Sequence, residues 1–497
     1  MSPSQSNLSD HQSKKLSGRE RWFFDNRKAL SGIIVFPAEG MLGVKASDAT
    51  LKAAFNLVVK NVPILQTEVA GDEDDAIFQK ISDEDIDEKV HCLEIETQIE
   101  QNETFMMERA RSIMSEILTT LREGGQDSYR LSIRVHAVRC PHAIAFTFVV
   151  PQQFSDGTGV ASIFAQLYAT QLLPSFAWPL MYTRPSSTKG MKLPPSFYET
   201  AFKTEDAFEI CKNLLNINQL EENPKKTEEK QLLRFIEYDF SSPDAISKLR
   251  GMEETLAVAS SKSLEKTLSE LRKDGISLTS AFDALTTKVV SRLIAEDSYS
   301  DSTSSDASLR ATSKLGDLTV LSLIDARQFG NISKDSKIEM PLSKAFAEVG
   351  NYIFTHNTQI SFKDALAQPL QAIAKRIKEG FTRLQTDETY RACHVAASMS
   401  TTKGAKLSLY CGTSSLLVSP RFLQRMGVNI TSEIKHDFGA MPRCWFYAIS
   451  HGSKTVIAAD IFLPLPNLTA EMTRRVVLEE CKGTPLEYLF HQPNVSQ

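Results

Sequence analysis

The chain of 497 residues contains no long hydrophobic run, because no stretch of 18 consecutive apolar residues occurs. The sequence therefore predicts no membrane-spanning helix. The first residues have no apolar core, so no cleaved signal peptide is expected either. The seven cysteines are odd in number, scattered and without a Cys-x-x-Cys pair. That usage excludes a disulfide framework and a cysteine-based zinc site, and it predicts reduced thiols in a cytoplasmic protein.

The sequence also lacks a block of lysine and arginine, and its formal net charge is −5. A nucleic-acid partner is therefore not expected. No Gly-x-Ser-x-Gly elbow, His-Glu-x-x-His helix motif or Rossmann or P-loop glycine pattern occurs, which leaves hydrolase, metalloenzyme and nucleotide-binding functions without support. With 42% hydrophobic and 24% charged residues, the composition is that of a soluble globular protein. No bound metal is expected, because no Cys/His ligand spacing occurs.

Apolar periodicity predicts strands that alternate with helices, which favours an α/β fold with two mixed-sheet lobes. The expected strands lie at 29–36, 128–138, 143–151, 232–240, 318–324, 405–411, 443–450 and 454–462. The expected helices run from Ser47 or Asp48 to Pro63 and over 101–122, 243–273, 279–295, 362–382 and 469–481, besides one that follows Asp156. The predicted domain organisation is a disordered tail at 1–17, an N-terminal lobe at 18–200, a charged connector at 201–231 and a C-terminal lobe at 232–497 with a flexible insertion at 297–314.

Residues 148–160 are the most informative stretch of the chain. They predict a buried strand, a tight turn at Gly157-Thr158-Gly159 and the start of an amphipathic helix. Asp-Gly and Gly-Thr-Gly are common turn chemistry, so on its own this stretch indicates only a strand-to-helix turn with a helix cap.

Other landmarks in the same order along the chain change that interpretation. They are Asn61-Val-Pro-Ile-Leu65, Gln152-x-x-x-Asp156-Gly157, Asp325-Ala-Arg327, Gly350-Asn351 and Asp437-Phe438-Gly439. This ordered set resembles the superfamily of BAHD acyltransferases, condensation domains and chloramphenicol acetyltransferase. In that superfamily the central motif is His-x-x-x-Asp-Gly, so this chain resembles a divergent member with Gln152 in the histidine position.

The resemblance implies two similar lobes with a tunnel between them. It further implies an O-acyltransferase that uses acyl-CoA, or an acyl-carrier donor, on a small acceptor of specialised metabolism. No bound cofactor and a monomeric state are expected.

The resemblance also assigns roles to individual residues. Asp156 is expected to be structural and to pair with Arg327, while Gln152 occupies the catalytic position. The other residues expected to be structural are Asp325, Asn351, Asp437 and Gly439. The residues expected to contact substrate are Tyr129, Gly157 and His436.

A glutamine cannot replace the missing histidine as a base. A carboxamide has no titratable proton near pH 7, although it can accept and donate hydrogen bonds. Loss of general base catalysis typically costs about 10²- to 10⁴-fold in rate. Gln152 could still hold an acceptor hydroxyl or donate to a developing oxyanion.

Few side chains in the sequence are candidates to replace the motif histidine as the base. His136 is expected opposite residue 144 of the hairpin, too far along the strand from Gln152. His436 is the least implausible base, and Tyr129, expected across the hairpin from Gln152, is a possible acid.

Three functions therefore stay open. The first is slow acyl transfer, and the second is a base-independent cyclisation, pericyclic step or elimination in the same cleft. The third is binding of acyl intermediates without catalysis.

Overall fold

The computed structural model describes residues 13–39, 47–71, 75–82, 85–89, 93–97, 103–172, 193, 201–202, 206–207, 209–213, 250–300, 317–329, 349–399, 410–414, 431–436, 443–451, 454–463, 465 and 468–490. Contacts between residues divide the chain into two compact units. The first comprises 1–200, 330–352 and 418–437, and the second comprises 201–329, 353–417 and 438–497. Neither unit is continuous in sequence.

The first unit contains five sheet strands in the order β12-β2-β7-β6-β5 and a small three-stranded sheet β1-β4-β3. Its strands are β1 (Ser13–Lys15), β2 (Ala29–Pro37), β3 (Thr67–Ala70), β4 (Ile77–Lys80), β5 (Glu94–Thr97), β6 (Arg134–Arg139), β7 (Ala143–Pro151) and β12 (Thr431–His436). Its helices are α1 (Gly18–Asp25), α2 (Asp48–Asn61), α3 (Ile86–Lys89), α4 (Glu103–Glu123) and α5 (Gly157–Leu172). Every pairing among those five sheet strands is antiparallel except that of β5 with β6.

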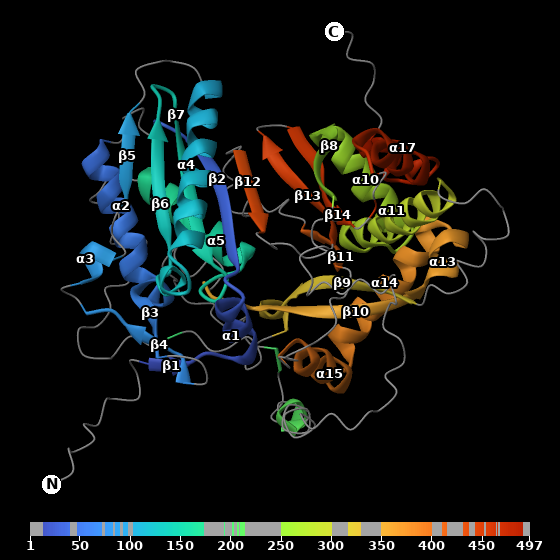
Figure 1. Cartoon of the computed structure of the whole chain (residues 1–497), viewed down its shortest axis with the longest axis horizontal. Helices are drawn as coiled ribbons and strands as arrows, with labels where there is room; N and C mark the ends of the chain where they lie inside the picture. The colour runs from blue at the N-terminus through green and yellow to red at the C-terminus, as the bar shows by residue number, and fades with distance from the viewer. Residues whose placement is uncertain are drawn as a thin grey trace. The chain divides into compact units, whose positions relative to one another are not determined.

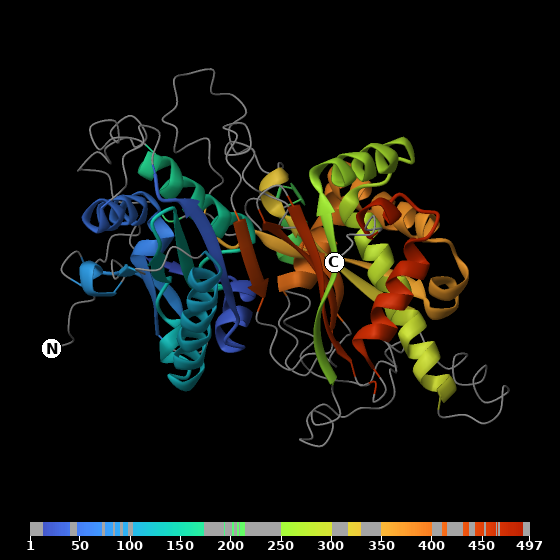
Figure 2. The same ribbon diagram turned by 90° about the horizontal axis from the view of Figure 1, so that it is seen from above.

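Strand β7 lies in the interior of this sheet, and all nine of its residues are buried. Both faces are covered, so its sequence is a continuous apolar run rather than an alternating one. Phe148 packs on Phe164 of α5 at 4.9 Å between ring centroids. On the opposite face, the Thr147 hydroxyl donates to the Ala110 carbonyl of α4. Figures 1 and 2 show α4 and α5 on the two sides of the sheet. The end of β7 is thereby held firmly where the candidate site begins.

The strands of the second unit follow the order β10-β9-β11-β13-β14-β8. Its strands are β8 (Arg250–Ser260), β9 (Asp317–Asp325), β10 (Ile353–Ser361), β11 (Tyr410–Ser414), β13 (Arg443–His451) and β14 (Lys454–Leu463). Its helices are α10 (Ser261–Lys273), α11 (Leu278–Ser300), α13 (Phe362–Ala367), α14 (Leu370–Thr386), α15 (Glu388–Met399), α17 (Ala470–Cys481) and α18 (Glu487–Phe490). Strand β11 runs parallel to β9 and β13, and the other pairs are antiparallel.

Helix α11 is the centre of the second unit's core. It packs against α14 and α17 (Figure 1), and its apolar side chains from Ala281 to Ala295 are buried among those of the sheet. Its buried Lys288 is satisfied by its surroundings, because Nζ donates to the carbonyls of Ala365 and Gln368. Nζ also lies 3.4 Å from the Glu480 carboxylate.

The structure confirms the α/β fold class with two mixed-sheet units, whereas the tunnel between lobes stays a prediction. Strands at 29–36, 143–151 and 454–462 and the helix capped by Ser47 are confirmed within a residue or two. No helix among the described residues is long and apolar enough to cross a membrane.

Three element predictions were wrong. Residues 250–260 form strand β8 instead of the first half of a helix, because they pair along ten residues with β14. The helix expected over 362–382 is broken at Pro369, whose ring cannot continue a helix. Strand β6 begins at Arg134 and not at 128, because Asp127–Tyr129 forms a 3-10 turn.

Several predicted segments fall partly or wholly outside the described residues. These include 1–12 of the tail, the strand expected at 232–240, most of 201–231 and 301–314 of the expected insertion. Two described parts differ from the expectation of disorder. Residues 13–15 pair with β4 as β1, and residues 297–300 complete α11.

Candidate functional site

The candidate site is the turn that joins β7 to α5, where Gln152 follows the last residue of the strand. The Gln152 N–H donates to the Lys28 carbonyl at the start of β2, at 2.9 Å. The Phe154 N–H donates back to the Pro151 carbonyl at 3.0 Å and closes the turn. The buried sheet thus fixes where the chain leaves it, and the backbone at Gln152 is held on the β2 side.

Asp156 is the cap of helix α5. Its Oδ1 accepts from the Gly159 N–H at 2.8 Å, and its carbonyl accepts the first helical hydrogen bond from the Val160 N–H. This is the usual chemistry of an aspartate before a helix, because the first N–H groups of a helix have no partner within it. Gly157 follows as the first residue of α5, so the turn predicted at Gly157-Thr158-Gly159 was wrong: with Asp156 as cap, these residues form the first turn of the helix.

The segment at residues 350–352 holds the same turn from another part of the sequence. The Tyr352 N–H donates to Asp156 Oδ2 at 2.8 Å, and the Asp156 N–H donates to the Gly350 carbonyl at 3.2 Å. Asn351 reaches the other end of the turn, where its Nδ2 donates to the Gln152 carbonyl at 2.7 Å. We call these three contacts the 350–352 clamp. It fixes the turn at both ends.

Gly159 leaves room for the Ser155 side chain of the turn. A Cβ atom at this position would lie 2.4 Å from Ser155 Oγ and 3.4 Å from the Gly350 nitrogen and oxygen. The glycine of the Gly-Thr-Gly sequence is therefore explained by packing.

The two neighbouring glutamines have different surroundings. Gln152 is 8% exposed, whereas Gln153 is fully buried. Gln153 is held by its Nε2, which donates to the Tyr129 carbonyl at 2.6 Å. Tyr129 is itself buried, in the 3-10 turn before β6. The predicted substrate contact Tyr129 therefore lies near the turn and contacts it through its backbone.

The histidines considered as substitute bases lie elsewhere in the first unit. His136 is paired opposite Thr147, not opposite residue 144 as expected, because the hairpin turns at Pro141 and His142, between Cys140 and Ala143. Its partner Thr147 is five residues before Gln152 in the chain, so His136 lies about 17 Å from Gln152 along the strand direction. His436 ends β12, and its backbone lies opposite Leu30 of β2. Strand β2 separates β12 from β7. The backbone of His436 therefore lies two strand spacings, about 10 Å, from that of β7.

The remaining predicted site residues lie in the second unit or outside the described residues. Asp325 ends β9, and its Oδ1 accepts from both the Arg327 N–H and Arg327 Nη1, each at 3.0 Å. The expected pair of Asp156 with Arg327 would join residues of different units, and it stays a prediction. Asp437 and Gly439 lie outside the described residues.

Side-chain patterns missed part of the site. The partner atoms at Lys28 and Tyr352 belong to the backbone, so the residue type at these positions gives no signal, whereas Gly350 belongs to the Gly-Asn landmark. Only the Gly-Asn landmark pointed to Asn351.

The chemistry available at this turn follows from these contacts. Both carboxylate oxygens of Asp156 accept backbone N–H groups, which supports its structural role. Gln152 offers an amide that can donate or accept one hydrogen bond but cannot take a proton at neutral pH. The turn can orient a polar group or stabilise an oxyanion, and it cannot act as a general base through these two side chains.

Comparison with known proteins addresses the fold. No family model matches the sequence, and no curated protein matches it. Solved structures do match. The X-domain from teicoplanin biosynthesis has a TM-score of 0.52 at 12% identity, covering 97% of this chain and 98% of that one. The EpoB nonribosomal peptide synthetase cyclization-docking bidomain from Sorangium cellulosum has a TM-score of 0.50 at 15% identity, covering 98% and 87%.

The chain has the condensation-domain fold. At 12% and 15% identity the likeness concerns the fold alone. It covers nearly the whole chain, which agrees with the ordered landmarks that extend from Asn61 to Gly439. The features specific to BAHD acyltransferases, and the role of Gln152, stay predictions.

Proposed function

We propose that this protein transfers an acyl group from a thioester donor to a small acceptor at the Gln152 turn. The donor is either acyl-CoA or an acyl-carrier thioester. The acceptor hydroxyl or amine attacks the thioester carbonyl carbon. The carbon–sulfur bond breaks, an ester or amide forms, and the acceptor proton leaves with the thiol or the solvent. Supporting the proposal is one observation: the turn at the motif position is buried and hydrogen-bonded at both ends by the 350–352 clamp.

In this proposal some residues position the Gln152 backbone, the Gln152 amide contacts the reacting groups, and no histidine takes part. The clamp and the α5 cap hold the backbone of Gln152 in place, so its side chain starts from a fixed point. A positioned amide can stabilise the oxyanion of the tetrahedral intermediate or hold the acceptor. Because no imidazole takes the proton, we expect a slow reaction whose rate depends on the acceptor's own acidity.

A cyclisation of a bound substrate is the second candidate. The EpoB structure, which has a TM-score of 0.50, is that of a cyclization-docking bidomain. A glutamine can orient an intramolecular attack as well as an intermolecular one. Non-catalytic binding of acyl intermediates is the remaining possibility.

The test is incubation of the full chain with a panel of acyl-CoA thioesters and candidate alcohol and amine acceptors. Released thiol and the mass of the acylated product are both measured. We expect acceptor-dependent thiol release in the wild type. Gln152→Ala is expected to reduce it roughly 10- to 100-fold, the effect of one lost hydrogen bond in the transition state.

Gln359→Ala is the matched control, since Gln359 is exposed on β10 in the second unit. It is expected to keep wild-type turnover. Product without thiol release would favour cyclisation. A ligand that binds while no product forms with any donor would support the non-catalytic alternative and contradict acyl transfer.

A further inference from the structure

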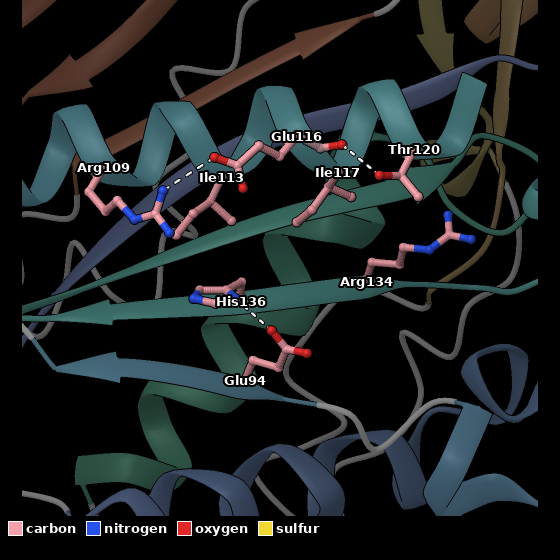
Figure 3. A pocket seen from close by; sticks show the side chains of 8 residues that line it. All are labelled: Glu94, Arg109, Ile113, Glu116, Ile117, Thr120, Arg134 and His136. Carbon is pink, nitrogen blue, oxygen red and sulfur yellow. Dashed lines mark hydrogen bonds and ion pairs between the residues drawn. The ribbon is translucent and has the colours of Figure 1, made fainter. Parts of the chain in front are cut away.

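A cleft of about 340 Å³ lies within the first unit, between helix α4 and strands β5 and β6, and the Gln152 turn takes no part in it. Figure 3 shows the side chains that line it. They are Glu94, Arg109, Ile113, Glu116, Ile117, Thr120, Arg134 and His136.

Two isoleucines give the cleft an apolar wall. Ile113 and Ile117 are one helical turn apart on α4, and both point toward β6 (Figure 3). Side chains four residues apart share one face of a helix. A ligand in the cleft therefore meets a continuous aliphatic surface on this side.

One arginine of the cleft is already neutralised. Arg109 Nε lies 3.0 Å from Glu96 Oε2, and its Nη1 lies 3.2 Å from Glu116 Oε1. Glu96 of β5 and Glu116 of α4 thus share this guanidinium. Arg109 offers little charge to a ligand.

Arg134 differs in this respect. Its Nη2 donates to the Ser128 carbonyl at 2.9 Å, and its Nη1 is buried with no hydrogen-bond partner among the described residues. No carboxylate of the described chain forms an ion pair with it. Burial lowers the pKa of the guanidinium, yet an arginine keeps its charge in proteins. A half-buried positive charge thus lines the cleft without a carboxylate within ion-pair distance among the described residues, which is an unfavourable arrangement.

His136 lies two residues further along β6, on the same face. Its Nδ1 is 3.3 Å from Glu94 Oε2, while its Nε2 is buried without a hydrogen-bond partner among the described residues. This contact holds the imidazole against the carboxylate, which leaves Arg134 as the uncompensated cation of the cleft.

We propose that this cleft binds a small monocarboxylate with an apolar body. The carboxylate supplies the counter-charge that Arg134 lacks, and the body packs on Ile113 and Ile117. Glu94 and Glu116 also line the cleft, so a dianion such as a phosphate monoester meets repulsion that a single negative charge largely escapes.

The probe is 3-phenylpropanoate, which has one carboxylate and an apolar ring, with 3-phenylpropanamide as its neutral isostere and phenyl phosphate as a dianion. Binding to the full chain is measured by calorimetry and by ligand-observed NMR. We expect a dissociation constant of about 0.1–1 mM for the carboxylate, as for a ligand of this size. The amide and the phosphate are expected to bind at least about 10-fold more weakly.

Two arginine variants locate the bound probe. Arg134→Gln is expected to weaken 3-phenylpropanoate at least about 10-fold. Arg111→Gln is the matched control, since Arg111 is an exposed residue of α4 outside the cleft. It is expected to bind like the wild type, as is Gln152→Ala.

Equal binding of the carboxylate and the amide to the wild type would overturn the proposal even if Arg134→Gln fails to fold. So would wild-type affinity in Arg134→Gln, or the absence of binding up to about 10 mM. Thioester turnover enters none of these readouts, so the proposal stands or falls independently of acyl transfer.

Discussion

Asp156 links the turn to both helix α5 and the 350–352 clamp. One carboxylate oxygen caps α5, and the other accepts the Tyr352 N–H of the clamp. The residue is only 3% exposed, so neither N–H has water as an alternative partner. Loss of a helix cap typically costs about 1 kcal/mol, and a buried N–H left without a partner costs about 1–3 kcal/mol.

Asp156→Ala is therefore expected to lower the free energy of unfolding by about 2–4 kcal/mol. Asp156→Asn keeps one oxygen acceptor, so it should lose about half as much. Urea unfolding followed by circular dichroism measures both. An Asp156→Ala variant as stable as the wild type would show that the two hydrogen bonds do not form.

The predicted pair of Asp156 with Arg327 is a separate question, because the resemblance implies it and the turn's own contacts do not require it. A double-mutant cycle with Asp156→Asn and Arg327→Gln isolates the coupling. If the pair forms and is buried, we expect a coupling energy of about 1–3 kcal/mol. Additive effects would leave Arg327 with Asp325 as its structural partner.

At the scale of elements, β10, α14 and α15 meet around a buried histidine. His356 of β10 is 1% exposed, and its Nε2 lies 3.0 Å from the Tyr390 hydroxyl. The His394 ring packs on it at 4.6 Å between centroids. Gly380 of α14 makes room, since a Cβ there would lie 2.3 Å from the imidazole.

This cluster predicts loss of stability in acid. Burial, and then the charge of His394, lower the pKa of His356 from 6.5 to about 4. Between pH 4 and 6.5, His356 binds a proton in the unfolded chain but not in the folded one. The folded state therefore has its full stability with respect to His356 above pH 6.5, and this stability declines as the pH falls toward 4. The shift corresponds to roughly 3 kcal/mol at most.

Unfolding curves at several pH values between neutral and acid test this prediction. His356→Gln should be less stable at neutral pH but show a shallower loss of stability on acidification. The same pH slope in the variant and the wild type would assign the loss to other groups. Burial also lowers the pKa of His394, so a His356→Gln, His394→Gln double variant should be shallower still.

Elements with a strong local signal were predictable, whereas those defined by distant partners were not. The apolar run of β7 and the Ser47 cap of α2 are readable from the residues alone. Strand β8 is not, because Glu, Leu and Ala favour a helix locally, and only the pairing with β14 makes 250–260 a strand. The break at Pro369 did have a signal in the sequence, the proline itself.

At the scale of the molecule, the first unit depends on segments from far along the chain. Strand β12 pairs with β2 along six residues, and the 350–352 clamp holds the β7–α5 turn. Both come from beyond residue 200. The same dependence explains why the site could be predicted only in part, since most of the atoms that the turn contacts are backbone atoms brought together by the fold.

A fragment of residues 1–200 is therefore expected not to fold as a stable domain. It would expose the edge of β2 and leave the buried carboxylate of Asp156 without its Tyr352 partner. Expression of the fragment, with hydrogen exchange of β2 and β7 compared with the full chain, measures this. Protection equal to that in the full chain would show that the first unit is self-sufficient.

The central claim, that acyl transfer takes place at the Gln152 turn, is tested most directly by the pH–rate profile of Gln152→His. If the turn presents this side chain to the reacting acceptor, the imidazole restores a general base. Turnover should then rise by about 10-fold or more, with a new inflection near pH 6.5 that the wild type lacks. Gln359→His, which adds an imidazole at an exposed position, should change neither rate nor profile. A Gln152→His profile that overlays that of the wild type, at unchanged turnover, would contradict the claim.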